Sequence, residues 1–325
     1  MKHISLLLPY GLNVAGMDNA RQGFLEANNY LVDRGKKPAF KLELIGASHQ
    51  LEAQQGVFMI KADRTLADLE HTDIIIIPPV KGYMPDILQN NTPYYPWITN
   101  QYQKGAEVVS ICLGAFLLAQ TGLLNGKKCA THWHATTELQ RLFPKVSVMT
   151  DKILTDENRI YTGGGAFSSA NLILYLIEKF SNRETAVYCS KIFQIDPGRH
   201  TQSPFAIFSG QKDHGDKEIE KAQEFIERNA EEKISINELC DNVALARRTL
   251  ERRFKKATSN TVTEYIQRVK VETAKKHLEG GIKTVNEVMF DVGYSDTKSF
   301  REIFRKHTGV TPLEYKNRYR KPRLK

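Results

Sequence analysis

The chain has 325 residues, of which 41% are hydrophobic and 26% are charged, a composition typical of a folded protein with room for two domains. No apolar run approaches the roughly 20 residues of a membrane-spanning helix, and the opening apolar run is too short for a signal peptide. We therefore expect a cytoplasmic protein with no membrane partner. The four cysteines lie far apart without a Cys-x-x-Cys pair, which argues against a disulfide framework and a zinc knuckle.

The net charge of +9 is distributed unevenly along the chain. Residues 231–325 carry 22 Lys and Arg against 13 Asp and Glu, whereas residues 1–230 carry 24 of each kind. The whole positive surplus therefore lies in the C-terminal segment, where a polyanion such as DNA would bind.

The first two thirds of the chain alternate between predicted strands and helices. Apolar runs and alternating patterns predict strands at 3–8, 40–45, 57–60 and 73–80, and apolar positions at helical spacing predict helices at 17–32 and 95–103. After Asp73 the segment 73–80 is apolar throughout, which predicts a central strand of a parallel sheet. The predicted class is α/β.

A strand at 107–112 leads at once into a helix that begins at Gly114, which predicts a tight turn with Cys112 at its tip. A helix N-terminus close behind a cysteine favours its reactive thiolate. The alternative is that Cys112 is a small buried residue in a turn kept only as architecture. A hydrolase would also need a base, for which His132 and His134, at the end of the next predicted strand, are the candidates. No third metal ligand is apparent, so we predict neither a metal nor a cofactor.

Three glycines, 163–165, lie between a hairpin-like segment at 153–162 and a predicted helix at 166–180. They could cradle an anion at the N-terminus of that helix. A crowded turn between strand and helix explains the three glycines nearly as well.

The segment 284–312 has the pattern of two short helices around a glycine turn. The first apolar face ends before Asp291, the turn contains Gly293, and Ser295 or Asp296 can cap the second helix. The second helix is basic on its outer side, as in the unit that places a helix in a DNA major groove. The alternative is an ordinary helical hairpin with a solvated charged face.

The same pattern occurs earlier in the chain, with Leu250 in the place that Phe300 occupies 50 residues later. A longer amphipathic helix from about 263 to 279 joins the two copies. The side chains expected to bind DNA on the two basic helices are Arg248, Thr249, Arg252, Thr297, Lys298 and Arg301. Other lysines, among them Lys275 and Lys276, are interpreted as phosphate contacts or solubilising charges.

The segments SICLGAFLLAQTGLLNGKKCATHWHA and RIYTGGGAFSSANLILYLIEKF resemble the amino-terminal domain of GlxA-type transcription regulators, whose fold is that of PfpI and class I glutamine amidotransferase-like proteins. The resemblance implies a flavodoxin-like α/β sandwich over residues 1–210. It also implies a ligand crevice formed by Cys112, Leu113, His132, Gly164 and Gly165.

Hydrolases of this fold commonly carry a histidine directly after the cysteine and an acidic residue from the first loop. Here Leu113 follows Cys112, and Asp18 is the only nearby acidic candidate. We therefore predict a vestigial turn, no catalytic residue and no enzyme activity, with ligand sensing at the same crevice.

The segment VNEVMFDVGYSDTKSFREIFRKHTGVTPLEY is similar to the signature of the AraC/XylS DNA-binding domain. The resemblance implies an all-α double helix-turn-helix domain over residues 231–325, preceded by a linker and lead-in helix at 211–230. The first copy departs from the family where Ala246 replaces the usual capping Ser and Val262 the usual Pro. Loss of the cap predicts a less ordered start of the first basic helix.

Together these features predict a sequence-specific regulator of the AraC family that binds double-stranded promoter or operator DNA. We expect control by a small-molecule effector of the amine, amino acid or carboxylate class, a homodimer, and contact with RNA polymerase if the protein is an activator. The alternative is a cysteine-dependent hydrolase or amidotransferase-like enzyme with an appended DNA-binding domain.

Overall fold

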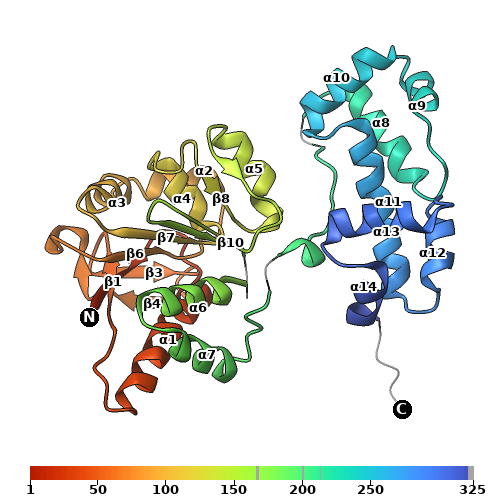
Figure 1. Ribbon diagram of the computed structural model, residues 1–325. Coiled ribbons are helices and arrows are strands. Elements are labelled where there is room, and N and C mark those ends of the chain that lie inside the picture. The colour runs from red at the N-terminus through yellow and green to blue at the C-terminus, as the bar shows by residue number, and fades with distance from the viewer. Residues whose placement is uncertain (166–167, 200, 213, 321–325) are drawn as a thin grey trace. The chain divides into compact units, whose positions relative to one another are not determined.

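The computed structural model describes residues 1–165, 168–199, 201–212 and 214–320. The chain divides into two compact units, Met1–Gln202 and Ser203–Lys325 (Figure 1). The first unit is α/β and the second is helical, as the sequence predicts. None of the helices in the described part of the chain combines the length and the apolar character needed to cross a membrane.

A seven-stranded sheet in the order β10-β11-β7-β6-β1-β2-β5 forms the centre of the first unit. Its strands are β1 (Lys2–Leu8), β2 (Phe40–Gly46), β5 (Arg64–Thr65), β6 (Ile74–Ile77), β7 (Glu107–Ile111), β10 (Leu154–Glu157) and β11 (Ile160–Gly163). Neighbouring strands run parallel, except that β10 and β11 form an antiparallel hairpin. The all-isoleucine strand β6 lies in the middle, which confirms the prediction from its apolar run.

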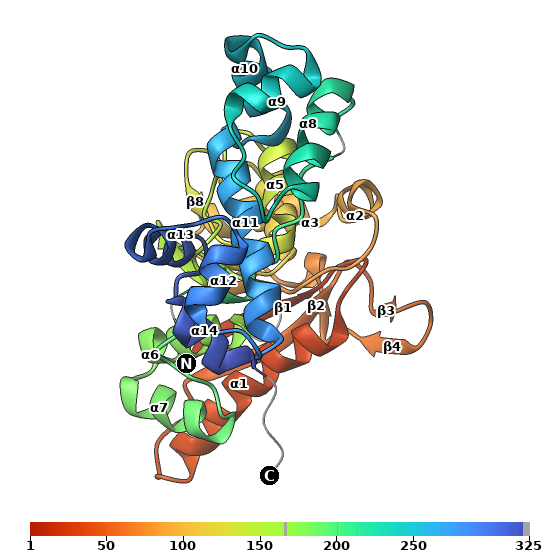
Figure 2. The ribbon, with the colours of Figure 1, turned by 90° about the vertical axis from the view of Figure 1, so that its right-hand side faces the viewer.

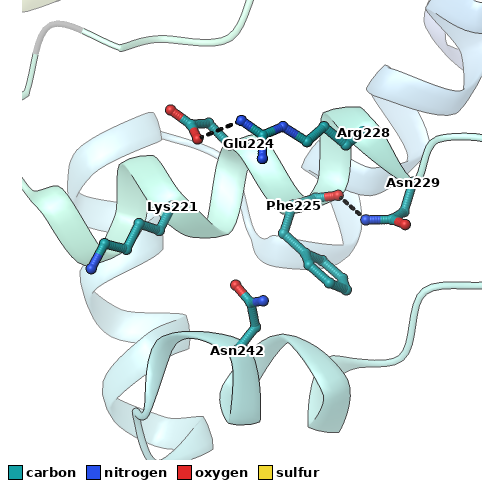
Figure 3. Close-up of a pocket in the computed structure, with 6 residues that line it drawn as sticks. All are labelled: Lys221, Glu224, Phe225, Arg228, Asn229 and Asn242. Atoms are coloured by element: carbon teal, nitrogen blue, oxygen red, sulfur yellow. Dashed lines mark hydrogen bonds and ion pairs between the residues drawn. The ribbon is translucent and has the colours of Figure 1, made fainter.

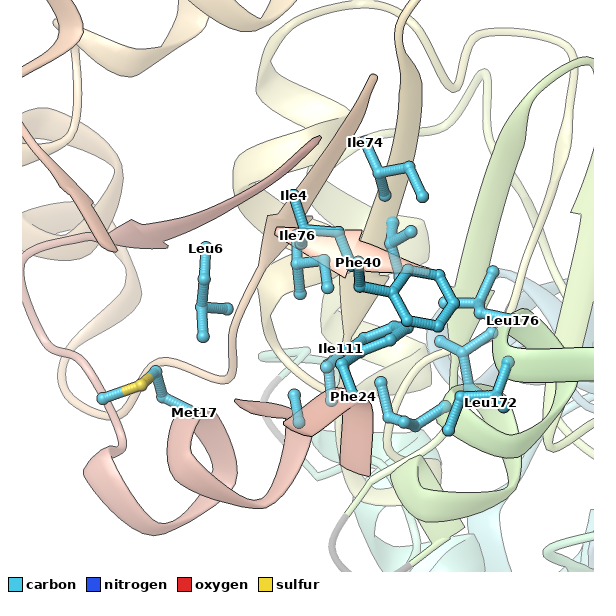
Figure 4. Packing of buried hydrophobic residues seen from close by; sticks show 14 of the residues in the cluster. Ile4, Leu6, Met17, Phe24, Phe40, Ile74, Ile76, Ile111, Leu172 and Leu176 are labelled. Atoms are coloured by element: carbon cyan, nitrogen blue, oxygen red, sulfur yellow. The ribbon is translucent and has the colours of Figure 1, made fainter. Parts of the chain in front are cut away.

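Helices cover both faces of this sheet. One face packs against α1 (Val14–Val32), α6 (Ser169–Phe180) and α7 (Arg183–Ile192), and the other against α2 (Met84–Asn90), α3 (Tyr94–Gln103), α4 (Gly114–Gln120) and α5 (Thr136–Leu142). Figure 4 shows Phe24 of α1 and Leu172 of α6 near Phe40 of β2, in the core between the sheet and the helices α1, α6 and α7. The ring centroids of Phe24 and Phe40 are 4.9 Å apart, and both side chains are fully buried.

Two of the expected strands lie outside the main sheet. The strand β4 (Phe58–Lys61) pairs with β3 (Gln50–Ala53), and β8 (Lys128–Cys129), which precedes His132, pairs with β9 (Ser147–Val148). Strands of two to four residues offer too few side chains to determine which neighbour they join. The helix expected from Ala166 is described from Ser169, and its expected start lies outside the described residues.

The second unit contains seven described helices, preceded by a short 3-10 turn at Ser203–Phe205. They are α8 (Lys217–Arg228), α9 (Ile236–Val243), α10 (Arg247–Thr258), α11 (Val262–Glu279), α12 (Val285–Asp291), α13 (Thr297–Thr308) and α14 (Pro312–Tyr319). Figure 2 shows α11 running from the group of α8, α9 and α10 to the group of α12, α13 and α14. Each group has its own core, the first around Leu250 and Phe254 and the second around Phe300 and Phe304.

Helix caps repeat between the two groups. Capping boxes with Ser or Thr at the cap and Glu three residues later begin α9, α11, α12 and α14. The side chain of Asp296 caps α13, whereas Ala246 precedes α10 without a side-chain cap, which confirms the predicted difference. Pro312 begins α14, a helix that the sequence analysis did not predict.

The first residues of the second unit are held against α11. The ammonium of Lys275 donates to the carbonyl of Ala206 at 2.7 Å, and the Glu272 carboxylate accepts the Phe208 backbone N–H at 3.1 Å. The division between the two structural units therefore lies after Gln202, whereas the sequence analysis expects the first domain to end at residue 210. Lys275 is 3% exposed, so its interpretation as a surface charge is wrong. The helical spacing of the residues around Lys275 could not show that the preceding loop covers that face.

Candidate functional site

Cys112 occupies the sharp turn between β7 and α4 that the sequence predicts. Its φ is +56°, in the left-handed region that a residue with a side chain rarely adopts, and it is 8% exposed. Backbone strain of this kind is typical of turns that hold one side chain at the edge of a sheet.

The carboxyl ends of β7 and β11 meet beside this turn. The backbone N–H of Cys112 donates to the carbonyl of Gly163 at 3.0 Å, and the Thr131 hydroxyl donates to the carbonyl of Cys112 at 2.8 Å. Gly163 pairs with Ile111 in the parallel ladder, so the next two glycines leave the sheet next to Cys112.

His132 lies against the second of these glycines. A Cβ added at Gly165 would lie 1.8 Å from Cδ2 of His132, so glycine is required for this approach. Nδ1 of His132 accepts the backbone N–H of His134 at 3.2 Å. Burial, together with the neighbouring His134, lowers the pKa of His132, which favours the neutral imidazole at pH 7.

Gly164 is less tightly enclosed. Its N–H donates to the carbonyl of Ile153 at 2.6 Å, and an added Cβ would lie 3.2 Å from the Ser168 hydroxyl. Leu113 follows Cys112 directly and caps α4. The predicted crevice residues therefore converge on one edge of the sheet, although the strand before His132 is not part of that sheet.

Gln202 is a buried residue of this edge that sequence reasoning missed. It is 2% exposed, and its amide donates to the carbonyls of Thr131 at 2.9 Å and Lys152 at 3.1 Å. Its side-chain oxygen accepts the Trp133 N–H at 3.1 Å. Gln202 is also the last residue of the first unit, so the residue at which the chain leaves this unit is hydrogen-bonded to the neighbours of His132. Its polar sequence surroundings are typical of a linker and gave no signal.

The acid–base groups around this turn are engaged elsewhere. The Asp18 carboxylate, the nearby acid expected from the resemblance, pairs with Arg21 at 2.7 Å. Burial raises the pKa of Cys129 to about 12 and that of Cys189 to about 11, so both thiols stay protonated at neutral pH. In the described residues no three His, Cys, Asp or Glu side chains are placed to hold a metal ion.

Two hollows lie apart from these residues. A cavity of about 770 Å³ between β10, α6 and α7 has an apolar wall that includes Ile153 and Leu174. The carbonyl of Ile153, a lining residue of this cavity, also accepts the backbone N–H of Gly164. A smaller hollow of about 360 Å³ lies between α8 and α9 (Figure 3), where Glu224 pairs with Arg228 at 3.3 Å.

The basic helices α10 and α13 are oriented by their buried anchors. Leu250 and Phe300 are fully buried, each in the core of its own group. Of the residues predicted to contact DNA, Thr249 and Thr297 are half-buried. The exposed members are Arg248, Arg252, Lys298 and Arg301.

Some of the cationic side chains on α10 form ion pairs within the described part of the chain, whereas others on α10 and α13 do not. Arg253 pairs with Asp216 at 2.5 Å and with Glu218 at 2.6 Å, which ties α10 to the start of α8. Arg247 pairs with Glu251 along α10 at 3.0 Å. Within the described ranges no ion pair engages the four exposed cations Arg248, Arg252, Lys298 and Arg301. Their charges are therefore available to phosphates and base edges.

Comparison with known proteins matches both units. The family model of the DJ-1/PfpI family matches residues 27–179, and a helix-turn-helix domain model matches residues 239–318. The HTH-type transcriptional regulator GbdR of Pseudomonas aeruginosa is 28% identical over 269 residues, which cover 82% of this chain and 71% of GbdR. The HTH-type transcriptional regulator CdhR of the same species is 24% identical over 311 residues, which cover 95% of this chain and 89% of CdhR.

The fold is also similar to a solved structure. The crystal structure of a putative transcriptional regulator protein from Vibrio parahaemolyticus is 20% identical, with a TM-score of 0.53, and the match covers 59% of this chain and 98% of that one. GbdR and CdhR, which match most of this chain, are regulators, whereas the isonitrile hydratase of Pseudomonas putida is 30% identical over only 127 residues; the longer matches favour a non-enzymatic protein over the hydrolase alternative. The chain therefore carries a DJ-1/PfpI domain and a helix-turn-helix domain and is a transcription regulator similar to GbdR and CdhR over most of its length.

Proposed function

We propose that this regulator reads operator DNA with α10 and α13 and senses a small metabolite at the Cys112 crevice. The observation that carries the proposal is the set of exposed cations on two repeated helices, Arg248, Arg252, Lys298 and Arg301, which no ion pair engages within the described residues. Each helix is anchored by a buried side chain. In this assignment the unit that ends at Gln202 forms the sensor and residues 231–325 form the reader, with the segment that contains the lead-in helix between them.

The length of α11 suits reading of two neighbouring grooves. Its 18 residues span about 27 Å at 1.5 Å per residue. With its flanking turns, it can set α10 and α13 in successive major grooves, which are about 34 Å apart on one face of DNA. Arg248, Thr249 and Arg252 would contact one set of bases, and Thr297, Lys298 and Arg301 the other.

A selection of bound duplexes from a random pool by the full chain tests this reading. We expect two short blocks of specified bases, with centres about 10 base pairs apart. A single block, or enrichment without any base preference, would contradict reading by both helices.

The effector site is proposed at the carboxyl edge of the sheet, where ligands of doubly wound folds bind. The close backbone approach at Gly165 and the neutral imidazole of His132 support this location. The expected ligands are small amines, amino acids or carboxylates. A screen of such compounds for thermal stabilisation of the full chain would identify the effector, and a compound that also changes operator affinity would confirm its role.

Regulation requires that the effector bind one state of the protein more tightly than another. We propose a homodimer as the form that exists in these states, because closed pairwise symmetry is the commonest assembly. An activating form would contact RNA polymerase, and DNA reading implies action in the cytoplasm.

A further inference from the structure

A buried lysine lies where the two cores of the reader meet. Lys270 is 6% exposed in the middle of α11. The residue before it, Val269, belongs to the core of the first group, and the residue after it, Val271, belongs to the core of the second. Lys270 therefore marks the boundary between the two helix-turn-helix halves.

The ammonium of Lys270 bonds the backbone of both halves. Nζ donates to the carbonyls of Ala230 at 3.2 Å and Glu232 at 2.5 Å, in the loop after α8. It also donates to the carbonyl of Val292 at 2.7 Å, at the end of α12. A lysine ammonium has three N–H donors, and all three are matched here. Burial lowers the pKa of Lys270, and the negative charge of Glu232 opposes this shift.

The turn of the second motif comes close to the same point. Gly293 has a φ of +72°, and a Cβ added there would lie 2.9 Å from Nζ of Lys270 and 3.1 Å from the Glu232 carbonyl. Two turns along α11, the His277 ring lies 3.3 Å from the Glu231 carboxylate and 3.4 Å from that of Asp291. The loop after α8 and the turn after α12 are thus held together against one face of α11.

We propose that Lys270 is a positioning residue that fixes the separation of α10 and α13, and so determines the spacing of the two base sets that the regulator accepts. The inference rests on the proposed reading by both helices. The two halves have separate cores, so α11 alone would let them pivot about the boundary. Charge-assisted hydrogen bonds from one side chain to both halves restrict that pivot.

The test measures affinity of the full chain for duplexes that carry the two base sets at the selected spacing and at one or two base pairs more or less. We expect the unaltered protein to lose about tenfold in affinity per added or removed base pair, the range that single mismatches cost. Lys270→Met keeps the apolar stem and removes the three hydrogen bonds. The affinity that Lys270→Met loses per added or removed base pair should fall to about threefold or less, and its affinity for the duplex with the selected spacing should decrease by a smaller factor.

A matched control separates positioning from general destabilisation. Ile219 is fully buried in the first core but lies at the start of α8, away from the loop that Lys270 holds. Ile219→Ala should lower the melting temperature and retain the spacing discrimination. If Lys270→Met does not fold, Lys270→Gln, a shorter side chain with two donors, should weaken the discrimination in the same direction.

The outcomes distinguish the two claims. Unchanged discrimination in a folded Lys270 variant, or an equal loss in Ile219→Ala, would overturn the positioning role and leave reading by two helices intact. An unaltered protein that is indifferent to spacing would overturn both.

Discussion

His307 shows how one side chain of the reader responds to its surroundings. It lies on α13 half-buried against α11, facing Arg268 and Glu264, with Lys306 beside it. Burial, and then the charges of Arg268 and Lys306, lower the pKa of His307 to about 4. Within the described residues its Nε2 has no hydrogen-bond partner. The folded protein therefore keeps this imidazole neutral at pH 7.

The pKa of His307 gives a pH-dependent stability. Below about pH 6.5 the imidazole of His307 is protonated in the unfolded chain, whereas in the folded chain it stays neutral until about pH 4. The contribution of the neutral ring to the free energy of unfolding is therefore full above pH 6.5 and is lost as the pH falls. Allowing for partial solvation of the ring, we expect a loss of about 1–2 kcal/mol by pH 4. In His307→Ala, which copies Ala257 of the first motif, the melting temperature should fall less between pH 7.5 and 5. His49→Ala, at an exposed position, is the control. Parallel curves for the unaltered chain and His307→Ala would contradict the assignment.

The two glycines at the crevice give a matched pair of substitutions. In Gly165→Ala the new methyl group must displace the His132 ring, whereas in Gly164→Ala it meets its nearest neighbour at 3.2 Å and needs only small shifts. We expect Gly165→Ala to raise the concentration of an identified effector that is needed for a given thermal shift by at least about tenfold, and Gly164→Ala to raise it far less. Operator affinity without effector should be unchanged in both. A normal effector response in Gly165→Ala would place the effector site elsewhere, with the cavity beside Ile153 as the next candidate.

Residue-level prediction succeeded where the backbone pattern dictates the environment. The tight turn at Cys112 followed from a strand that runs directly into a helix. It failed for Lys275 and gave no signal for Gln202 and Lys270, because polar residues in a loop or an amphipathic helix are expected at the surface. Only the packing of distant segments buries them.

At the scale of elements, the missing cap of α10 can be restored. Ala246 has extended backbone angles suited to a cap, and its counterpart Asp296 accepts the Ser299 N–H at 2.7 Å. Ala246→Ser should raise the free energy of unfolding by about 1 kcal/mol, and Asp296→Ala should lower it by about 1 kcal/mol. Urea unfolding of the full chain, followed by the helical circular dichroism signal, measures both. Neither change should alter which bases are selected, and a destabilised Ala246→Ser would contradict the role of residue 246 as a cap.

The helical repeat was easier to predict than the small sheets. Leu250 and Phe300 mark equivalent positions, and further pairs at the same spacing behave alike. The hydroxyls of Thr258 and Thr308 each donate to the carbonyl four residues earlier, at 2.8 Å. Helical contacts are local, so a short sequence pattern specifies them. The partner of β8 is 18 residues away and shares only two residue pairs with it, which periodicity cannot specify.

At the scale of the whole molecule, the sequence predicted the two units and their order, because charge and periodicity change between them. The structural units divide after Gln202, and the Pro-, Gly- and Ser-rich segment that follows is typical of a linker whether or not a helix holds it. Lys275 and Glu272 hold that segment against α11 through hydrogen bonds to Ala206 and Phe208.

The central claim is that α10 and α13 read separate base sets, and selection from random duplexes with Arg252→Ala and Arg301→Ala tests it most directly. A base-reading arginine is worth about 1–3 kcal/mol of discrimination, whereas a phosphate contact weakens all sequences alike. We predict that Arg252→Ala loses base preference in one block and Arg301→Ala in the other, with the blocks still about 10 base pairs apart. An equal loss of affinity for selected and random DNA in both variants would show instead that these helices only hold the phosphate backbone.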